Sequence, residues 1–232
     1  MTDFTINVQL DLEKDARNYR RAFNANTHAS KRKEQVAQIT TIDLNKISGM
    51  SEHDTYIFLH NYLEQFWKNN KQKAESKIKT MQETLDLHKQ RFFIDMEKLT
   101  KHPIYRHDFI VFLTSLNRWP YNYSRGYTWS YIDWDWVCRA FVHELLHFQT
   151  IHYYKEHIMS KLHDEKKFED LKESLTFLLN YIFKDSIEWY DAWYPQHQEL
   201  RKKLEDYRVS QPADQRDFEK LIEYWCDILT KE

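Results

Sequence analysis

Two histidines, His143 and His147, enclose a glutamate, Glu144, in the sequence H-E-L-L-H. Residues four apart on a helix lie on the same face, so both imidazoles can reach one metal ion. Glu144 can reach a water molecule bound to that ion and act as the general base of a hydrolysis. The motif therefore predicts a catalytic Zn2+ site on a helix.

The third protein ligand must come from elsewhere, because catalytic zinc takes three protein ligands and keeps one position open. The extended metzincin motif requires Gly at position 150 and His at position 153, and the chain has Thr150 and Tyr153 instead. That class is excluded. A glutamate from the following predicted helix is the remaining common solution, which leaves Glu169 and Glu173 as candidates.

The chain resembles the gluzincins, a group of zinc peptidases, in the motif at 143–147 and in K-E-S-L-T at 172–176. In that group the third ligand is a helical glutamate followed by a small residue, a pattern that Glu173-Ser174 satisfies. The resemblance thus implies a zinc metallopeptidase with the metal ligands His143, His147 and Glu173. It also implies that the strand before the metal helix pairs with extended substrate.

A closer resemblance is to small bacterial metallopeptidases of uncharacterised function, and it covers about residues 105–201. It rests on three runs, His143–Phe148, Lys172–Asn180 and Tyr194–Arg201. One departure concerns position 177, where many gluzincins carry an acidic residue that holds a ligand histidine. Because Phe177 stands there, Thr176 or Asn180 would have to supply that bond.

Hydrolysis of a peptide also needs a donor for the developing oxyanion. Tyr194 and His197, in the run Y-P-Q-H-Q, are the candidates for this role. A ferritin-like di-iron site is excluded, because no second Glu-x-x-His occurs in the chain. The alternative that stays open is a non-catalytic, zinc-containing protein that binds a peptide or another partner.

The amino-acid composition limits the kinds of partner that are expected. Lys and Arg number 34 against 36 Asp and Glu, so nothing in the charge favours nucleic acid or an anionic membrane. Two cysteines, no apolar run of membrane length and no secretion signal favour a cytoplasmic protein. A peptide or protein substrate is the expected partner, and the oligomeric state stays open.

The expected fold is α+β and predominantly α-helical, because the chain has only 2 Gly and 4 Pro. Residues 1–104 are expected to form a helical N-terminal region, and residues 105–232 a zincin-like catalytic region. A small β-sheet or hairpin should precede the metal helix, with a strand at 108–115 and an edge or half-exposed strand at 123–131. The alternating apolar residues from Phe4 to Leu10 predict a half-buried strand or an irregular N-terminal arm. Helices are expected to begin at Ser51 and to span 69–100, 133–160, 164–183, 196–207 and 213–229.

Overall fold

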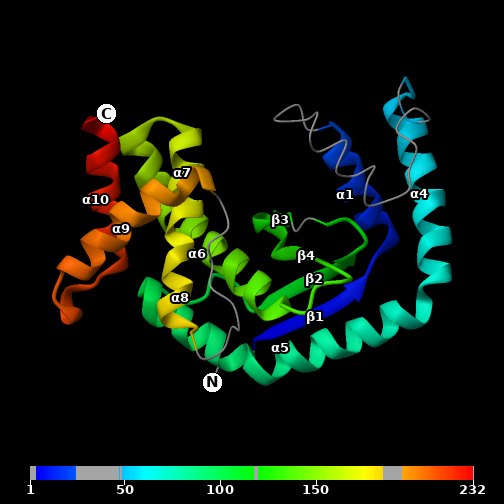
Figure 1. The fold of residues 1–232 in the computed structure, drawn as a ribbon, viewed down its shortest axis with the longest axis horizontal. Coiled ribbons are helices and arrows are strands. Elements are labelled where there is room, and N and C mark those ends of the chain that lie inside the picture. The colour runs from blue at the N-terminus through cyan, green and yellow to red at the C-terminus, as the bar shows by residue number, and fades with distance from the viewer. Residues whose placement is uncertain (1–3, 25–46, 48, 118–119, 185–194, 232) are drawn as a thin grey trace. The chain divides into compact units, whose positions relative to one another are not determined.

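The computed structural model describes residues 4–24, 47, 49–117, 120–184 and 195–231. They form a predominantly α-helical α+β fold with one small sheet, as expected from the sequence (Figure 1). The strands are β1 (Thr5–Leu10), β2 (Asp108–Thr114), β3 (Tyr121–Asn122) and β4 (Tyr127–Tyr131). The α-helices are α1 (Leu12–Asn24), α4 (Glu52–Asn69), α5 (Lys71–Thr100), α6 (Val137–Leu162), α7 (Glu165–Ser174), α8 (Leu179–Ile182), α9 (Gln198–Ser210) and α10 (Phe218–Lys231). Short 3₁₀ helices are η1 (Tyr123–Arg125), η2 (Leu175–Leu178), η3 (Pro195–His197) and η4 (Ala213–Gln215).

Two compact units make up the chain. The sheet unit comprises Thr5–Asp86 and Asp108–Val137, and the helical unit comprises Met1–Phe4, Leu87–His107 and Cys138–Glu232. This division differs from the linear boundary between residues 104 and 105 expected from the sequence. The reason is strand pairing over a long separation, because β1 from the start of the chain pairs with β2.

The sheet has the strand order β1-β2-β4-β3. β1, β2 and β4 run parallel, and only the two-residue β3 is antiparallel to β4. The strands expected at 108–115 and 123–131 are therefore not the two arms of one hairpin. The interpretation of 123–131 as an edge or half-exposed strand is also wrong. β4 lies between β2 and β3, and its small polar residues Thr128 and Ser130 are buried like Tyr127 and Trp129.

The outer edge of β1 is covered by a glutamine of α5. Gln82 Oε1 accepts a hydrogen bond from the Val8 backbone nitrogen at 2.8 Å, and Gln82 Nε2 donates to the Ile6 carbonyl at 2.8 Å. One side-chain amide thus satisfies the same donor and acceptor that a further strand would pair with. This covering removes part of the open edge that invites pairing with other chains.

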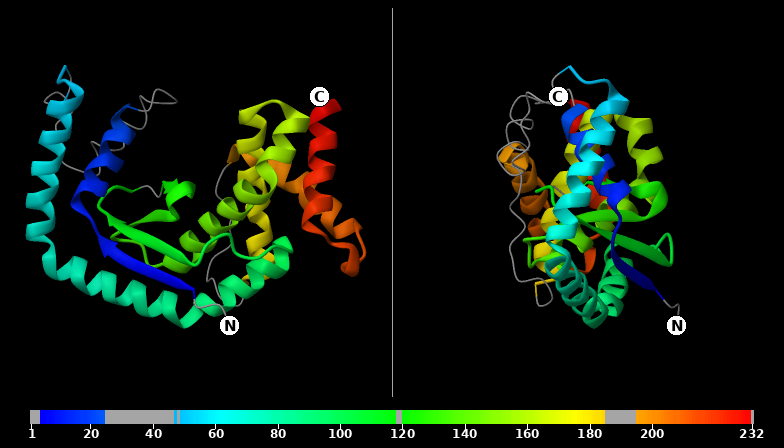
Figure 2. Two further views of the ribbon diagram at one scale, coloured as in Figure 1. Left: turned by 180° about the vertical axis from the view of Figure 1, so that it is seen from behind. Right: turned by 90° about the vertical axis from the view of Figure 1, so that its right-hand side faces the viewer.

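A buried carboxylate joins α1 and α4 to the end of β2. Asp15, fully buried on α1, accepts hydrogen bonds from Thr114 Oγ1 at 2.5 Å, from Trp67 Nε1 at 2.9 Å and from Ser115 Oγ at 3.3 Å. α1 and α4 lie side by side in the views of Figures 1 and 2, and Trp67 lies in the last turn of α4. The network therefore fixes both helices against the sheet.

This carboxylate predicts an unusual pH dependence. Burial raises the pKa of Asp15 from 3.8 to about 6, although the hydrogen bonds from Thr114, Trp67 and Ser115 oppose the rise. The folded state therefore binds this proton more tightly than the unfolded state does. The contribution of Asp15 to the free energy of unfolding is therefore expected to fall by about 3 kcal/mol as the pH rises from about 4 to about 6.

Urea unfolding of the wild type and of Asp15→Asn at several pH values between 4 and 7 measures this contribution. Other groups titrate in both proteins, so they cancel in the difference between the two. The wild type should lose its advantage over the variant as the pH rises through this interval. A difference that stays constant with pH would contradict the assignment.

In the helical unit, α6 is held to the end of α5 by Gln149. Its Oε1 accepts from the Tyr105 backbone nitrogen at 3.1 Å, and its Nε2 donates to the Pro103 carbonyl at 3.1 Å and to Thr100 Oγ1 at 3.4 Å. Tyr154 adds a bond of 2.8 Å from its hydroxyl to the Thr100 carbonyl. Gln149 lies two residues after His147, so these bonds fix the position of that part of α6. None of the helices in the described segments is both long and apolar enough to span a membrane.

Candidate metal centre

α6 carries the H-E-x-x-H motif, as the sequence predicts. Apolar side chains surround this part of the helix, and Val142, Leu145 and Leu146 are completely buried. His143 and His147 are themselves only 3% and 1% exposed. Buried imidazoles need polar partners, because an unsatisfied polar group in such surroundings costs on the order of a few kcal/mol.

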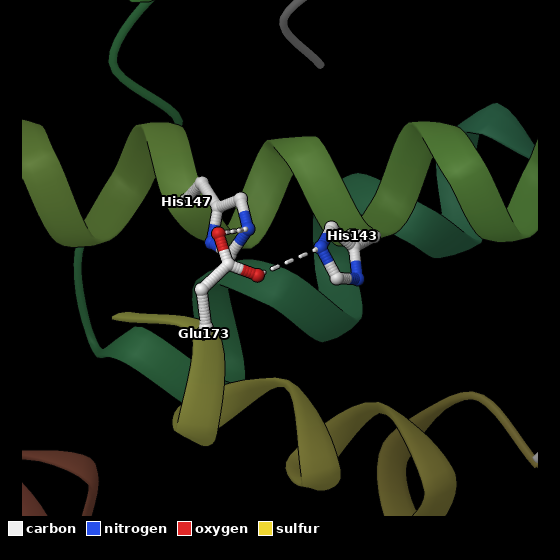
Figure 3. A group of neighbouring side chains, drawn as sticks. All are labelled: His143, His147 and Glu173. Atoms are coloured by element: carbon white, nitrogen blue, oxygen red, sulfur yellow. Dashed lines mark ion pairs between the residues drawn. The ribbon is translucent and has the colours of Figure 1, made fainter. Parts of the chain in front are cut away.

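The partner comes from α7. Asp164 caps this helix by accepting from the backbone nitrogens of Lys166 and Lys167, at 2.8 and 3.2 Å. Phe168 and Leu171 are fully buried and hold one side of α7 in the core. Glu173, in the last turn, then points its carboxylate toward the histidines of α6 (Figure 3).

Each imidazole faces a different carboxylate oxygen. His147 Nε2 lies 3.3 Å from Glu173 Oε1, and His143 Nε2 lies 3.7 Å from Glu173 Oε2 (Figure 3). One ligand atom from each of the three residues lies within 4.8 Å of the others. The centroids of the two imidazole rings are 4.5 Å apart, and the ring planes are nearly perpendicular. The three side chains thus converge on one small volume.

These dimensions fit a metal ion. Donor atoms bonded to one tetrahedral zinc at about 2.0–2.1 Å lie roughly 3.3–3.4 Å apart. The two nitrogen–oxygen separations in this cluster, 3.3 and 3.7 Å, are close to that value. Two imidazoles and one carboxylate are also a donor set that zinc accepts. The cluster could therefore hold a metal ion.

The protonation states also suit a metal. Burial lowers the pKa of His147 to about 4, although the nearby carboxylate of Glu173 opposes this, so His147 is neutral at neutral pH. Burial alone would raise the pKa of Glu173, but contacts with His147 and His143 outweigh it and hold that pKa well below its usual range. Metal ligands must be neutral imidazoles and ionised carboxylates, and both shifts are in the direction that favours those forms.

The other predicted glutamates occupy different surroundings. Glu169, the alternative third ligand, has a side chain that is 47% exposed and bonds to Lys172 Nζ at 2.6 Å. It does not belong to the cluster formed by His143, His147 and Glu173. Glu144, next to the first histidine, is buried at 2% exposure. The structure thus brings Glu173 to the histidines, and not Glu169.

Lys172 is a residue of the site that the sequence interpretation did not single out. Its side chain is only 1% exposed, and its Nζ lies 3.7 Å from Glu173 Oε1. The sequence does indicate its burial, because Lys172 lies four residues after Phe168 and three before Leu175, on the apolar face of the helix. A charged residue at a core position of an apolar stripe needs a buried partner. A fixed positive charge therefore borders the cluster.

The proposed oxyanion donors are only partly described. Tyr194 lies outside the described residues. His197 is 7% exposed in η3, and its Nδ1 lies 3.6 Å from Asp170 Oδ1 on α7. Asp170 lies one turn before Glu173, so His197 packs against the helix that supplies the third member of the cluster.

Thr176 and Asn180, the residues expected to support a ligand histidine, lie just after the glutamate helix. Thr176 donates its hydroxyl to the backbone carbonyl of Glu173 at 2.8 Å. It therefore stabilises the end of the glutamate helix, and this bond is not one to a histidine. Asn180 lies at the start of α8 and is half-buried.

Comparison with protein-family models, with curated proteins and with solved structures finds no match for this chain. The chemistry of the site therefore has to be inferred from its residues and their arrangement.

Proposed function

We propose that this protein is a zinc-dependent hydrolase of the gluzincin type, with a peptide or protein as substrate. The observation that carries the proposal is the convergence of His143, His147 and Glu173 on one small buried volume. A zinc ion held by these residues would supply Lewis-acid activation of water and of the scissile carbonyl. Among metals, zinc suits two imidazoles and a carboxylate with an open fourth position.

The side chains of the chain itself then have defined tasks. Glu144 follows His143 on the same buried helix, and its carboxylate accepts the proton of the attacking water. The same carboxyl group then returns that proton to the leaving amine nitrogen. His197 or Tyr194 donates a hydrogen bond to the developing oxyanion. Burial of Glu144 keeps competing water away from the proton transfer.

Lys172 is proposed to act on this site through Glu173. Its ammonium group lies 3.7 Å from Glu173 Oε1, so it favours the ionised carboxylate. The bond from Lys172 to Glu169 holds the ammonium group in place. This pairing leaves the other carboxylate oxygen of Glu173 oriented toward His143.

The proposal is tested by digesting a broad peptide library with the full chain. The protein is first treated with a chelator and then supplied with one equivalent of zinc, and mass spectrometry detects new peptide termini. Cleavage that disappears with the chelator and returns with zinc is the expected result. Tight binding of one zinc without cleavage of any peptide would instead favour a non-catalytic zinc-containing binding protein.

A further inference from the structure

A second concave site lies in the helical unit, apart from the metal centre. It is a pocket of about 380 Å³ between the end of α5, α8, the end of α9 and the start of α10. None of His143, His147 and Glu173 lines it. Its volume falls within the range of about 300–1,000 Å³ that is typical of small-molecule sites.

Positive charge dominates the lining of this pocket. Two carboxylates line it, Asp95 and Asp217, while its basic side chains are Arg91, Lys98, Lys101, Arg208, Arg216 and Lys220. The whole chain, by contrast, carries a net charge of -2. The excess of positive charge is therefore local, and it raises the concentration of anions at the pocket.

Both carboxylates are already engaged. Asp95 pairs with Arg91 at 3.3 Å and with Lys98 at 3.5 Å. Asp217 pairs with Lys101, and its other carboxylate oxygen accepts from the Glu219 backbone nitrogen at 2.8 Å. The two lining carboxylates thus pair with Arg91, Lys98 and Lys101, and the side of the pocket formed by Arg208 and Arg216 stays positive.

That positive side is formed by two arginines. The guanidinium of Arg208 lies over the ring of Tyr181, with 4.4 Å between its central carbon and the ring centroid. Arg216 donates from Nε to the Gln211 carbonyl at 3.3 Å. Within the described segments neither guanidinium forms an ion pair with a carboxylate. Glu205, which is close in sequence to Arg208, accepts instead from the Tyr181 hydroxyl.

The two guanidinium groups also repel each other. The pKa of Arg208 is lowered, first by partial burial and second by the positive charge of Arg216. The ring of Tyr181 and the Gln211 carbonyl hold the two groups in place despite this repulsion. An anion bound to both would remove the repulsion and form charge-assisted hydrogen bonds with each.

We propose that this pocket binds a small phosphate-bearing ligand, with Arg208 and Arg216 as the residues that hold the phosphate groups. Six basic side chains against two carboxylates in one small pocket suit an anion of high charge density, such as a diphosphate, more than a single carboxylate. Tyr207 lines the same pocket and stacks on Tyr224 with 3.9 Å between ring centroids, which gives the pocket one rigid apolar wall. This assignment does not depend on the metal centre or on its chemistry.

Isothermal titration of the full chain with inorganic pyrophosphate tests the proposal, with citrate as a carboxylate of comparable charge. Pyrophosphate is expected to bind with a defined stoichiometry of one and at least ten times more tightly than citrate. The double variant Arg208→Gln/Arg216→Gln should lose at least ten-fold in affinity. The control Lys202→Gln changes an exposed cation on the same helix and should bind as the wild type does.

None of these substitutions changes a residue of the metal centre, so a loss of affinity in the arginine variants reports on this pocket alone. If the double variant is unstable, Arg216→Gln alone serves, because that residue is exposed and outside the core. Equal affinity of the arginine variants and the wild type would overturn the site. Equal affinity for citrate and pyrophosphate would overturn its assignment to phosphate.

Discussion

Glu144→Gln is expected to reduce peptide hydrolysis by roughly 10²- to 10⁴-fold while one zinc per chain remains bound. Loss of a positioned general base has an effect of that order. Glutamine keeps nearly the same shape and remains polar, but it cannot accept the proton of water. Glu144 does not belong to the three-residue cluster, so the metal affinity should stay close to that of the wild type.

Hydrolysis of a peptide identified from the library, followed at saturating zinc, measures this effect. The control is Glu156→Gln, which makes the same chemical change at an exposed position of the same helix and should leave the rate unchanged. Metal analysis of each variant separates loss of the base from loss of the ion. Wild-type activity in Glu144→Gln would remove this residue from the mechanism.

Glu173→Gln is expected to lower the affinity for zinc by more than about 100-fold. Changes to residues that merely support a ligand already cost about 10- to 100-fold, and Glu173 is proposed to contact the ion itself. The matched control is Glu169→Gln, one turn earlier on α7, which makes the same change in a side chain that is 47% exposed. Its zinc affinity should fall by less than about ten-fold, because Glu169 acts on the cluster only through its bond to Lys172.

Zinc should also stabilise the folded protein, because a ligand that binds only the folded state raises the free energy of unfolding by about 2.7 kcal/mol at 100 times its Kd. Thermal unfolding with and without zinc measures this gain in the wild type and in both variants. The gain should disappear in Glu173→Gln and persist in Glu169→Gln. If zinc stabilises Glu173→Gln but not Glu169→Gln, the third ligand is Glu169. If zinc stabilises both variants as it does the wild type, it binds elsewhere.

Local chemistry accounts for the elements that the sequence could predict. The helix expected at Ser51 begins there, with the serine hydroxyl accepting from the Asp54 backbone nitrogen at 3.1 Å. The alternation of apolar residues near the N-terminus corresponds to β1, with Ile6 and Val8 buried. In both cases the determining contacts lie within a few residues, so a short stretch of sequence contains them.

Strand pairing could not be predicted in the same way. The sequence from Tyr123 to Tyr131 does not indicate that β2 pairs with one side of this strand. It also does not indicate that the small polar residues of β4 are buried. Alternating aromatic and small polar residues are compatible with a solvated face and with a tightly covered one. The choice between these depends on β2 and β3, whose pairing is a property of the whole sheet.

For the candidate site the same distinction applies. The spacing of His143 and His147 is enough to place both on one face of α6. The resemblance favoured Glu173 over Glu169, but that Glu173 faces the histidines depends on the orientation of a second helix, which the buried residues of α7 fix. Lys172 was missed because a lysine beside a glutamate is usually a solvated pair. Its burial follows from the orientation of α7, whose Phe168 and Leu171 are also buried.

The interleaving of the two units has a consequence for how the chain is made. β1 leaves the ribosome roughly a hundred residues before its partner β2, which at about 5–20 residues per second is a delay on the order of 5–20 s. During that time the edge of β1 toward β2 has no strand to pair with, and Gln82 of α5 can cover only the opposite edge. A nascent chain of this protein thus presents an open strand to chaperones or to other nascent copies until Thr114 has been synthesised.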